Sequence, residues 1–199
     1  MPRVSPDPRP LQHKKVFTTG EVAKLLCVSQ MSVIKWFNDG RMKGYRIPYS
    51  KDRRITRENL IEFMKTNHVP DEVFMDIRTN ILVVDDDPTI RSAVQVIFED
   101  DHEYHVESAV TGYEAGVKVA RTEPDVLVLD VMLSDMDARE LVKRIRADEK
   151  LKHTRILGIS GFFKQEDLSA LKAVGFDDFL FKPFTAAQLK EKIVALTAD

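Results

Sequence analysis

The hydrophobic pattern of the chain changes character near residue 79. From Thr79 onward, short apolar runs rich in β-branched residues alternate with helical patterns. This order is expected of a parallel sheet covered by helices on both faces. We predict strands at residues 81–84, 105–108, 126–129, 155–159 and 178–181, and helices near residues 88–100, 112–122, 137–147, 166–174 and 185–197. The pattern therefore predicts an α/β unit made of five βα repeats.

The first part of the chain has a different pattern. Thr18 or Thr19 can cap a first helix within residues 17–28, and Ser29 can cap a second helix that ends at Asp39-Gly40. Residues 41–55 then alternate apolar and basic side chains around a polar turn, which predicts a β-hairpin, and Thr56 can cap a third helix. Two short helices joined by a tight turn and followed by a hairpin predict a small α+β winged helix-turn-helix unit.

These patterns divide the chain into four segments. We expect a disordered arm over residues 1–15, a winged helix-turn-helix domain over 16–67, a linker over 68–78 and the α/β domain over 79–199. A length of 199 residues fits one small and one medium domain.

Charge separates the same two parts of the chain. Residues 1–66 carry 14 Lys and Arg against 6 Asp and Glu, a net charge of +8, whereas residues 67–199 carry 16 against 26, a net charge of -10. The basic part favours a polyanion as partner and the acidic part favours cations. The single cysteine, Cys27, excludes an intramolecular disulfide, and the scattered histidines exclude a zinc site. Without an apolar run that could span a membrane or act as a signal peptide, we expect a cytoplasmic protein.

Polar residues of complementary chemistry follow the predicted strands of the acidic part. Asp85 and Asp86 follow the first strand, Asp130 the third, Ser160 the fourth and Lys182 the fifth. Because the carboxyl ends of parallel strands share one edge of a sheet, we expect these side chains in one pocket. Clustered carboxylates repel one another unless a cation neutralises them, and oxygen ligands suit Mg²⁺. The set predicts an Mg²⁺ site in which Asp130 is a nucleophile, while Lys182 and Ser160 contact a phosphoryl group.

The acidic part resembles a receiver domain of the two-component response-regulator family. The matching segments are ILVVDDDP at 81–88, PDVLVLDVML at 124–133, ILGISG at 156–161 and DDFLFKPF at 177–184. The resemblance implies a doubly wound, flavodoxin-like fold with a five-stranded parallel sheet. It also implies that a sensor histidine kinase phosphorylates Asp130, and that the protein assists its own phosphoryl transfer and autodephosphorylation without being an enzyme for another substrate.

The same resemblance assigns further roles. Asp85 and Asp86 form the acidic pair that holds the metal ion with Asp130, and Met132 lends its backbone carbonyl to that ion. Ser160 is the switch hydroxyl and Phe179 the switch aromatic. Phosphorylation is expected to turn Phe179 and change the surface over residues 165–197, and a homodimer through that face is one expected output.

The chain departs from the family pattern in the loop after Asp130. The family often has a proline and a glycine where this chain has Ser134 and Ala138, so the conformation of the loop is less predictable. The Lys182-Pro183 peptide bond is cis in many members of the family.

A second family uses some of the same residues. Asp85, Asp87 and Thr89 match the Asp-x-Asp-x-Thr motif of haloacid-dehalogenase-type phosphatases, in which Asp85 would be the nucleophile. That alternative gives Asp130 no role, and we therefore favour the receiver.

The basic part resembles the small excisionase-like or MerR-like winged helix-turn-helix domains, on the segment SVIKW at 32–36 followed by Gly40. Val33, Trp36 and Phe37 share one face of the second helix and are expected in the core. The candidate contacts with duplex DNA lie on the other face and on the hairpin: Gln30, Met31, Ser32 and Lys35 for the major groove, and Arg46, Lys51, Arg53 and Arg54 for phosphates or a minor groove.

Together the two parts predict a phosphorylation-controlled, DNA-binding response regulator of transcription. In a second hypothesis the basic domain binds another protein, and the chain is a phosphorylation-gated adaptor. Salt dependence separates the two hypotheses, because binding to DNA phosphates weakens linearly in log salt concentration.

Overall fold

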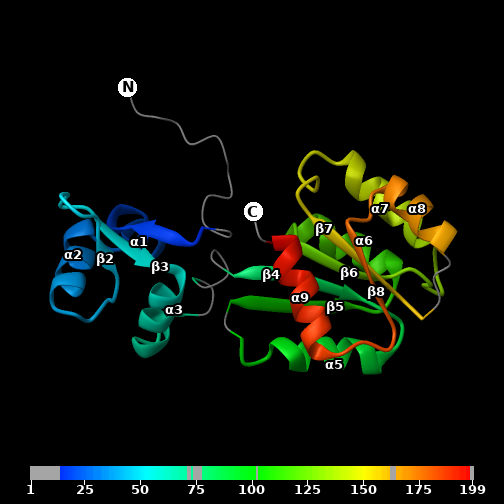
Figure 1. Ribbon diagram of the computed structural model, residues 1–199, viewed down its shortest axis with the longest axis horizontal. Coiled ribbons are helices and arrows are strands. Elements are labelled where there is room, and N and C mark those ends of the chain that lie inside the picture. Colours follow the sequence, from blue (N-terminus) through cyan, green and yellow to red (C-terminus); the bar gives the residue numbers. More distant parts are fainter. Residues whose placement is uncertain (1–13, 71–72, 74–77, 102, 162–164, 198–199) are drawn as a thin grey trace. The chain divides into compact units, whose positions relative to one another are not determined.

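The structure, a computed structural model, describes residues 14–70, 73, 78–101, 103–161 and 165–197, with only the backbone of 165–167. The chain divides into two compact units, Met1–Arg78 and Thr79–Asp199 (Figure 1). Most of the predicted arm and part of the predicted linker lie outside the described residues.

The first unit combines three helices with a three-stranded antiparallel sheet, counted over its described residues. Its elements are β1 (Val16–Thr18), α1 (Thr19–Leu25), α2 (Gln30–Asn38), β2 (Tyr45–Arg46), β3 (Arg53–Thr56) and α3 (Arg57–Thr66). The predicted hairpin is β2 and β3. Strand β1, which the sequence pattern did not predict, pairs with the other edge of β3 and completes the sheet.

Side chains cap the helices of this unit where the sequence predicted. Thr18 forms a capping box with Glu21, in which the Glu21 amide donates to Thr18 Oγ1 (3.2 Å) and the Thr18 amide donates to Glu21 Oε2 (2.8 Å). Ser29 accepts from the Ser32 amide at the start of α2 (3.1 Å), and Thr56 caps α3. These local hydrogen bonds fix where the helices begin.

One face of α2 is used for the core of the first unit. Val33 is fully buried, and Trp36 and Phe37 pack against the same apolar cluster, with the Trp36 and Phe63 rings 5.1 Å apart. The expected core role is confirmed for Val33, whereas Trp36 and Phe37 are partly buried at the edge of the core. Met31 and Lys35, outside that face, are exposed.

The second unit has the predicted parallel sheet with strand order β5-β4-β6-β7-β8. Its elements are β4 (Thr79–Val84), α5 (Pro88–Phe98), β5 (Tyr104–Ala109), α6 (Gly112–Thr122), β6 (Val126–Asp130), α7 (Ala138–Ala147), β7 (Arg155–Ser160), α8 (Gln165–Val174), β8 (Asp178–Phe181) and α9 (Ala186–Thr197). All neighbouring strands of this sheet are parallel.

Alternate side chains of each strand supply two apolar layers, one on each face of the sheet. Leu82 and Val84 of β4 join the cluster under α6, α7 and α8, whereas Ile81 and Val83 join the cluster under α5 and α9. Figure 1 shows these helices on opposite faces of the sheet. Burial on both faces explains why the central strands β4 and β6 contain continuous apolar runs, and the expected doubly wound fold is confirmed. No helix in the described part of the chain is long and apolar enough to cross a membrane.

Candidate functional site

The strand order places the predicted acidic residues at one edge of the sheet. Strands β4 and β6 are neighbours, and Val84 pairs with Leu129. An aspartate follows each of these two residues, so Asp85 and Asp130 lie side by side. Ser160 is the last residue of the adjacent strand β7. The predicted convergence of these residues therefore follows from parallel pairing.

Lys182 contacts both buried carboxylates. Its Nζ atom lies 2.6 Å from Asp85 Oδ2 and 2.6 Å from Asp130 Oδ2. The side chains of Asp85 and Asp130 are 0% and 9% exposed, and that of Lys182 is 20% exposed. One ammonium group is thus shared by two carboxylates that water scarcely reaches.

The environment shifts the pKa values of two of these groups. Burial raises the pKa of the Asp85 carboxyl, and the hydrogen bond from Lys182 offsets part of that rise. For Lys182, burial lowers the pKa, but the hydrogen bonds to Asp130 and Asp85 outweigh burial, so the pKa is raised. Lys182 is therefore positively charged at neutral pH.

Backbone amides orient the other oxygen of each carboxylate. The Met132 amide donates to Asp130 Oδ1 (2.8 Å), and the Asp87 amide donates to Asp85 Oδ1 (2.9 Å). Arg91 on α5 braces the same loop, because its Nη1 donates to the backbone carbonyls of Asp85 (2.7 Å) and Asp86 (3.1 Å). The role of Arg91 was not predicted, because the sequence around a helical arginine does not show which backbone carbonyls it contacts.

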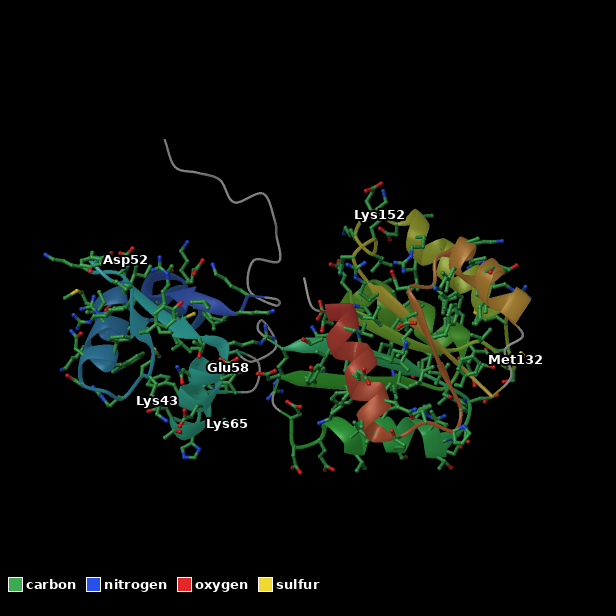
Figure 2. The ribbon with its side chains drawn as sticks, in the orientation of Figure 1. Lys43, Asp52, Glu58, Lys65, Met132 and Lys152 are labelled. Carbon is green, nitrogen blue, oxygen red and sulfur yellow. The ribbon has the colours of Figure 1, made fainter. Side chains whose placement is uncertain are left out.

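The acidic residues at this edge fit a hard divalent cation. Asp85, Asp86 and Asp130 each offer a carboxylate oxygen, and these oxygens lie within 4.8 Å of one another. An all-oxygen donor set of this kind suits Mg²⁺. Met132 has a side chain that is 72% exposed at the rim of the unit (Figure 2), and the role of its carbonyl as a metal ligand stays a prediction.

The two predicted switch residues occupy buried positions. Ser160 is 1% exposed, and its carbonyl accepts a hydrogen bond from the Lys182 amide (2.9 Å). Phe179 is 6% exposed and stacks on Phe176, with ring centroids 5.6 Å apart. A Cβ atom on Gly158 would come within 2.8 Å of the Phe179 ring, so the ring packs directly on that strand backbone. Phe179 is therefore turned into the core, and its movement in a switch stays a prediction.

The loop after Asp130 is ordered without the proline and glycine common in the family. Ala138 is fully buried as the first residue of α7, and the Asp137 carboxylate accepts from the Arg139 amide (2.9 Å) to cap that helix. Asp135 accepts from the amides of Gly112 (2.9 Å) and Tyr113 (3.1 Å) at the start of α6. Asp135 was not predicted, because its partners are 22 and 23 residues away along the chain. The Lys182-Pro183 peptide bond is cis.

The residues of the alternative phosphatase motif are placed differently. Asp87 is exposed and caps α5, where its carboxylate accepts from the Thr89 amide (2.8 Å). The Asp87 carboxylate is therefore used as a helix cap, which is a common role of an aspartate after a strand.

On α2 the candidate DNA contacts lie outside the core. Met31 is 72% exposed and Lys35 is exposed. Gln30 is also exposed, but its Nε2 donates to Thr19 Oγ1 of α1 (3.0 Å), and Ser32 shares a hydrogen bond with the capping Ser29. Met31 and Lys35 are thus the two of this set that form no side-chain hydrogen bond with another residue that the structure describes.

On the hairpin the structure brings together two of the four predicted basic residues. Arg46 and Arg53 are cross-strand neighbours, and both contact Asn38 at the end of α2. Arg54 lies on the opposite face of the strand, with Nη2 3.7 Å from Asp52 Oδ2. Lys51 is exposed in the turn.

Comparison with known proteins identifies both units. The family model of the response regulator receiver domain matches residues 81–194. The chain belongs to the response regulator receiver family. A second model, described as a helix-turn-helix domain, matches residues 16–68. A receiver domain joined to a helix-turn-helix domain is the arrangement of a DNA-binding response regulator.

The individual relatives match the receiver domain, and one of them is a transcriptional regulator. Chemotaxis protein CheY-3 of Vibrio cholerae is 34% identical over 122 residues, which are 61% of this chain and 94% of that protein. The DNA-binding dual master transcriptional regulator RpaA of Synechocystis is 31% identical over 116 residues, 58% of this chain and 48% of RpaA. Among solved structures, the chemotaxis response regulator CheY4 of Vibrio cholerae is 33% identical, with a TM-score of 0.56 over 60% of this chain and 98% of that chain.

Proposed function

We propose that this response regulator accepts a phosphoryl group on Asp130 from a sensor histidine kinase, and that phosphorylation controls binding of its helix-turn-helix domain to duplex DNA. The observation that carries the proposal is the convergence of Asp85, Asp130 and Lys182, with 2.6 Å contacts from the lysine to both carboxylates. The proposed partners imply a cytoplasmic location and a role in regulating transcription.

The phosphoryl transfer needs few groups from the protein. A carboxylate oxygen of Asp130 forms the new O–P bond while the N–P bond of the kinase phosphohistidine breaks, and the leaving imidazole takes a proton from solvent. Lys182 offers its positive charge to a phosphoryl oxygen beside Asp130, and Ser160 offers a hydroxyl hydrogen bond. Asp85, Asp86 and Asp130 would hold an Mg²⁺ ion, which would supply positive charge beside the phosphoryl oxygens.

A site map tests this assignment. Incubation with acetyl phosphate and Mg²⁺ should add one acid-labile phosphoryl group, seen by intact-mass spectrometry. Asp130→Asn should abolish the addition, whereas Asp87→Asn, at the exposed helix cap, should retain it. Intact labelling of Asp130→Asn would instead support the phosphatase motif, in which Asp85 is the nucleophile.

The DNA-binding part of the proposal rests on charge and on the free face of α2. Residues 1–66 have a net charge of +8, and Met31, Lys35, Arg46 and Arg53 lie outside the core. The affinity for a mixed-sequence duplex should fall linearly in log salt concentration. Flat salt dependence without retention on duplex DNA would favour the protein-binding adaptor.

The expected output is a homodimer through the 165–197 face of the receiver. Phe181 is 50% exposed and Val194 is 52% exposed within this range, so apolar surface is available for a second copy. A two-fold dimer would bring two helix-turn-helix domains to half-sites about 10 bp apart. Sedimentation with and without a phosphate mimic at Asp130 measures this step, and identical oligomeric states would argue against it.

A further inference from the structure

Asn38, the last residue of α2, holds two arginines of the hairpin. Its Oδ1 atom accepts hydrogen bonds from Arg46 Nη2 (3.0 Å), Arg53 Nε (3.3 Å) and Arg53 Nη2 (3.1 Å). Arg46 belongs to β2 and Arg53 to β3, and the two are partners in the antiparallel register. One amide oxygen thus gathers two guanidinium groups from neighbouring strands.

The ring of Phe37 supports the same pair. The guanidinium carbons of Arg46 and Arg53 lie 6.0 Å and 5.8 Å from the ring centroid. These distances are typical of a cation–π contact, and a planar guanidinium keeps its outward N–H groups when it rests on a ring. Phe37 therefore supports both arginines without cancelling their charge.

Gly44 lets the hairpin approach α2 this closely. A Cβ atom at this position would lie 2.3 Å from the Arg54 carbonyl oxygen and 2.8 Å from the Phe37 ring. Any side chain would push the hairpin away from the ring. The contact between Phe37 and the two arginines thus depends on a residue with no side chain.

The charge balance of this cluster differs from that of its neighbours. Nearby basic side chains are paired with acids: Arg41 with Asp39 at 3.3 Å, Lys43 with Glu62 at 2.7 Å and Arg54 with Asp52 at 3.7 Å. Among the residues that the structure describes, no carboxylate forms an ion pair with Arg46 or Arg53. Two like charges are held together by a neutral amide and a ring, at a cost in repulsion that a bound anion would remove.

Donor groups remain for such an anion. Arg53 Nη1 donates to the Lys51 carbonyl (3.2 Å), but each guanidinium has five N–H donors and only some are used. Arg46 and Asn38 are exposed. Paired guanidinium groups with free N–H donors match the oxygens of a phosphodiester.

We propose that Arg46 and Arg53 form a site for one phosphate of duplex DNA, and that Asn38 and Phe37 are the positioning residues that preassemble it. This inference rests on the proposed DNA binding and goes beyond it, because it assigns roles to two residues with no expected contact to DNA. Arg54 lies outside the site. Preassembly lowers the entropy cost of ordering two long side chains at the interface.

The test compares variants of the full chain by fluorescence anisotropy on a labelled mixed-sequence duplex of about two helical turns, across a range of salt concentrations. Asn38→Ala should weaken binding about three- to tenfold, because the arginines are no longer held. The paired substitution Arg46→Ala with Arg53→Ala should weaken binding further and reduce the slope in log salt by about 1. Lys65→Ala, which removes an exposed cation from α3, is the matched control and should have a smaller effect.

Asn38→Asp separates positioning from a purely structural role. A carboxylate is a stronger acceptor for both arginines, so the thermal stability of this variant should equal or exceed that of the wild type. Its charge cancels one of the two positive charges of the site, so its affinity for the duplex should fall below that of Asn38→Ala. Tighter binding by Asn38→Asp than by Asn38→Ala would overturn the inference.

A double-mutant cycle completes the test. Asn38→Ala should have no further effect once Arg46 and Arg53 are alanine, because Asn38 acts through them. An equal loss in that background would mean that Asn38 contacts DNA itself, and wild-type affinity of Asn38→Ala would mean that it positions nothing. Either result overturns the inference but leaves DNA binding intact, whereas a wild-type chain that binds no duplex overturns the proposed function as well.

Discussion

The Nζ atom of Lys182 lies 2.6 Å from a carboxylate oxygen of Asp130 and at the same distance from Asp85. One positive charge therefore serves two buried carboxylates, and a third carboxylate, Asp86, lies close to both. The receiver thus keeps uncompensated negative charge at the place of the proposed phosphoryl transfer. Lys182 is the group that makes this arrangement tolerable in the absence of a bound cation.

Replacing Lys182 by methionine should destabilise the receiver, because two buried carboxylates lose their counter-charge. We expect a loss of about 3 kcal/mol in the free energy of unfolding at neutral pH, measured by urea denaturation in EDTA. Mg²⁺ should restore part of the loss by supplying the missing charge. Lys152→Met is the matched control, since Lys152 is 54% exposed (Figure 2) and its ion pair with Glu149 lies at the surface.

The effect of Lys182→Met should depend on pH. Burial raises the pKa of Asp85 above 3.8, so its ionisation costs stability as pH rises through that range. The raised pKa of Lys182 keeps its contribution present until pH exceeds 10.5. The loss caused by Lys182→Met should therefore be smaller at about pH 4 than at about pH 7. An equal loss at both values would show that the lysine acts through packing alone.

Arg146 on α7 should contribute strongly to the stability of the receiver at the edge of the sheet where β7 and β8 begin. Its guanidinium donates to the carbonyl oxygens of Gly175 (2.7 Å) and Thr154 (2.7 Å) and to Asp177 Oδ2 (2.6 Å), with only 23% of the side chain exposed. Arg146→Ala should lower the free energy of unfolding by about 2–4 kcal/mol, because two carbonyl oxygens and the Asp177 carboxylate, which also accepts from the Ile156 amide, each lose a donor.

Two further variants define the role of Arg146. Arg146→Lys should recover a minor part of the stability, since an ammonium group cannot match the planar fork. Arg144→Ala, at an exposed position of the same helix, should stay within about 0.5 kcal/mol of the wild type. Equal denaturation midpoints for Arg146→Ala and Arg144→Ala would contradict this prediction.

Two glycines of α6 should respond in opposite directions to alanine. A Cβ atom on Gly116 would lie 3.8 Å from the Leu141 side chain, an ordinary contact, so Gly116→Ala should stabilise the helix by about 0.5–1 kcal/mol. A Cβ atom on Gly112 would lie 2.3 Å from Met136, so Gly112→Ala should destabilise by about 1–3 kcal/mol. Thermal melts of the two variants measure the difference, and a shared sign would refute the packing argument.

Asp135 should stabilise the receiver in a pH-dependent way. Hydrogen bonds from the Gly112 amide, and then from Tyr113, hold the pKa of this carboxyl below its usual value of 3.8, even though burial opposes ionisation. A lowered pKa means that the contribution is present above pH 3.8 and is lost as pH falls through the folded value.

The corresponding variant is Asp135→Ala. It should cost about 1 kcal/mol at neutral pH, because two amides at the start of α6 lose their acceptor. The difference from the wild type should shrink in acid. Asp100→Ala, at an exposed position of the same unit, is the control and should be neutral at both pH values.

The sequence by itself determined the features that depend on short-range chemistry. Burial on both faces makes the central strands β4 and β6 continuous apolar runs, and a side chain such as Ser29 caps its own helix within three residues. The acidic edge could also be predicted, because every parallel strand presents its carboxyl end at the same side of the sheet. Asp85, Asp130 and Lys182 were found in this way.

The tertiary structure alone decided which side chains touch. Strand β1 has only three residues, too few for a periodic pattern, and it exists because β3 offers a free edge. The sharing of Lys182 between two aspartates, the contact from Asp135 to α6 and the hydrogen bonds from Arg46 and Arg53 to Asn38 join residues of different elements. Such contacts depend on register and side-chain rotamers, which packing selects only after the elements have come together.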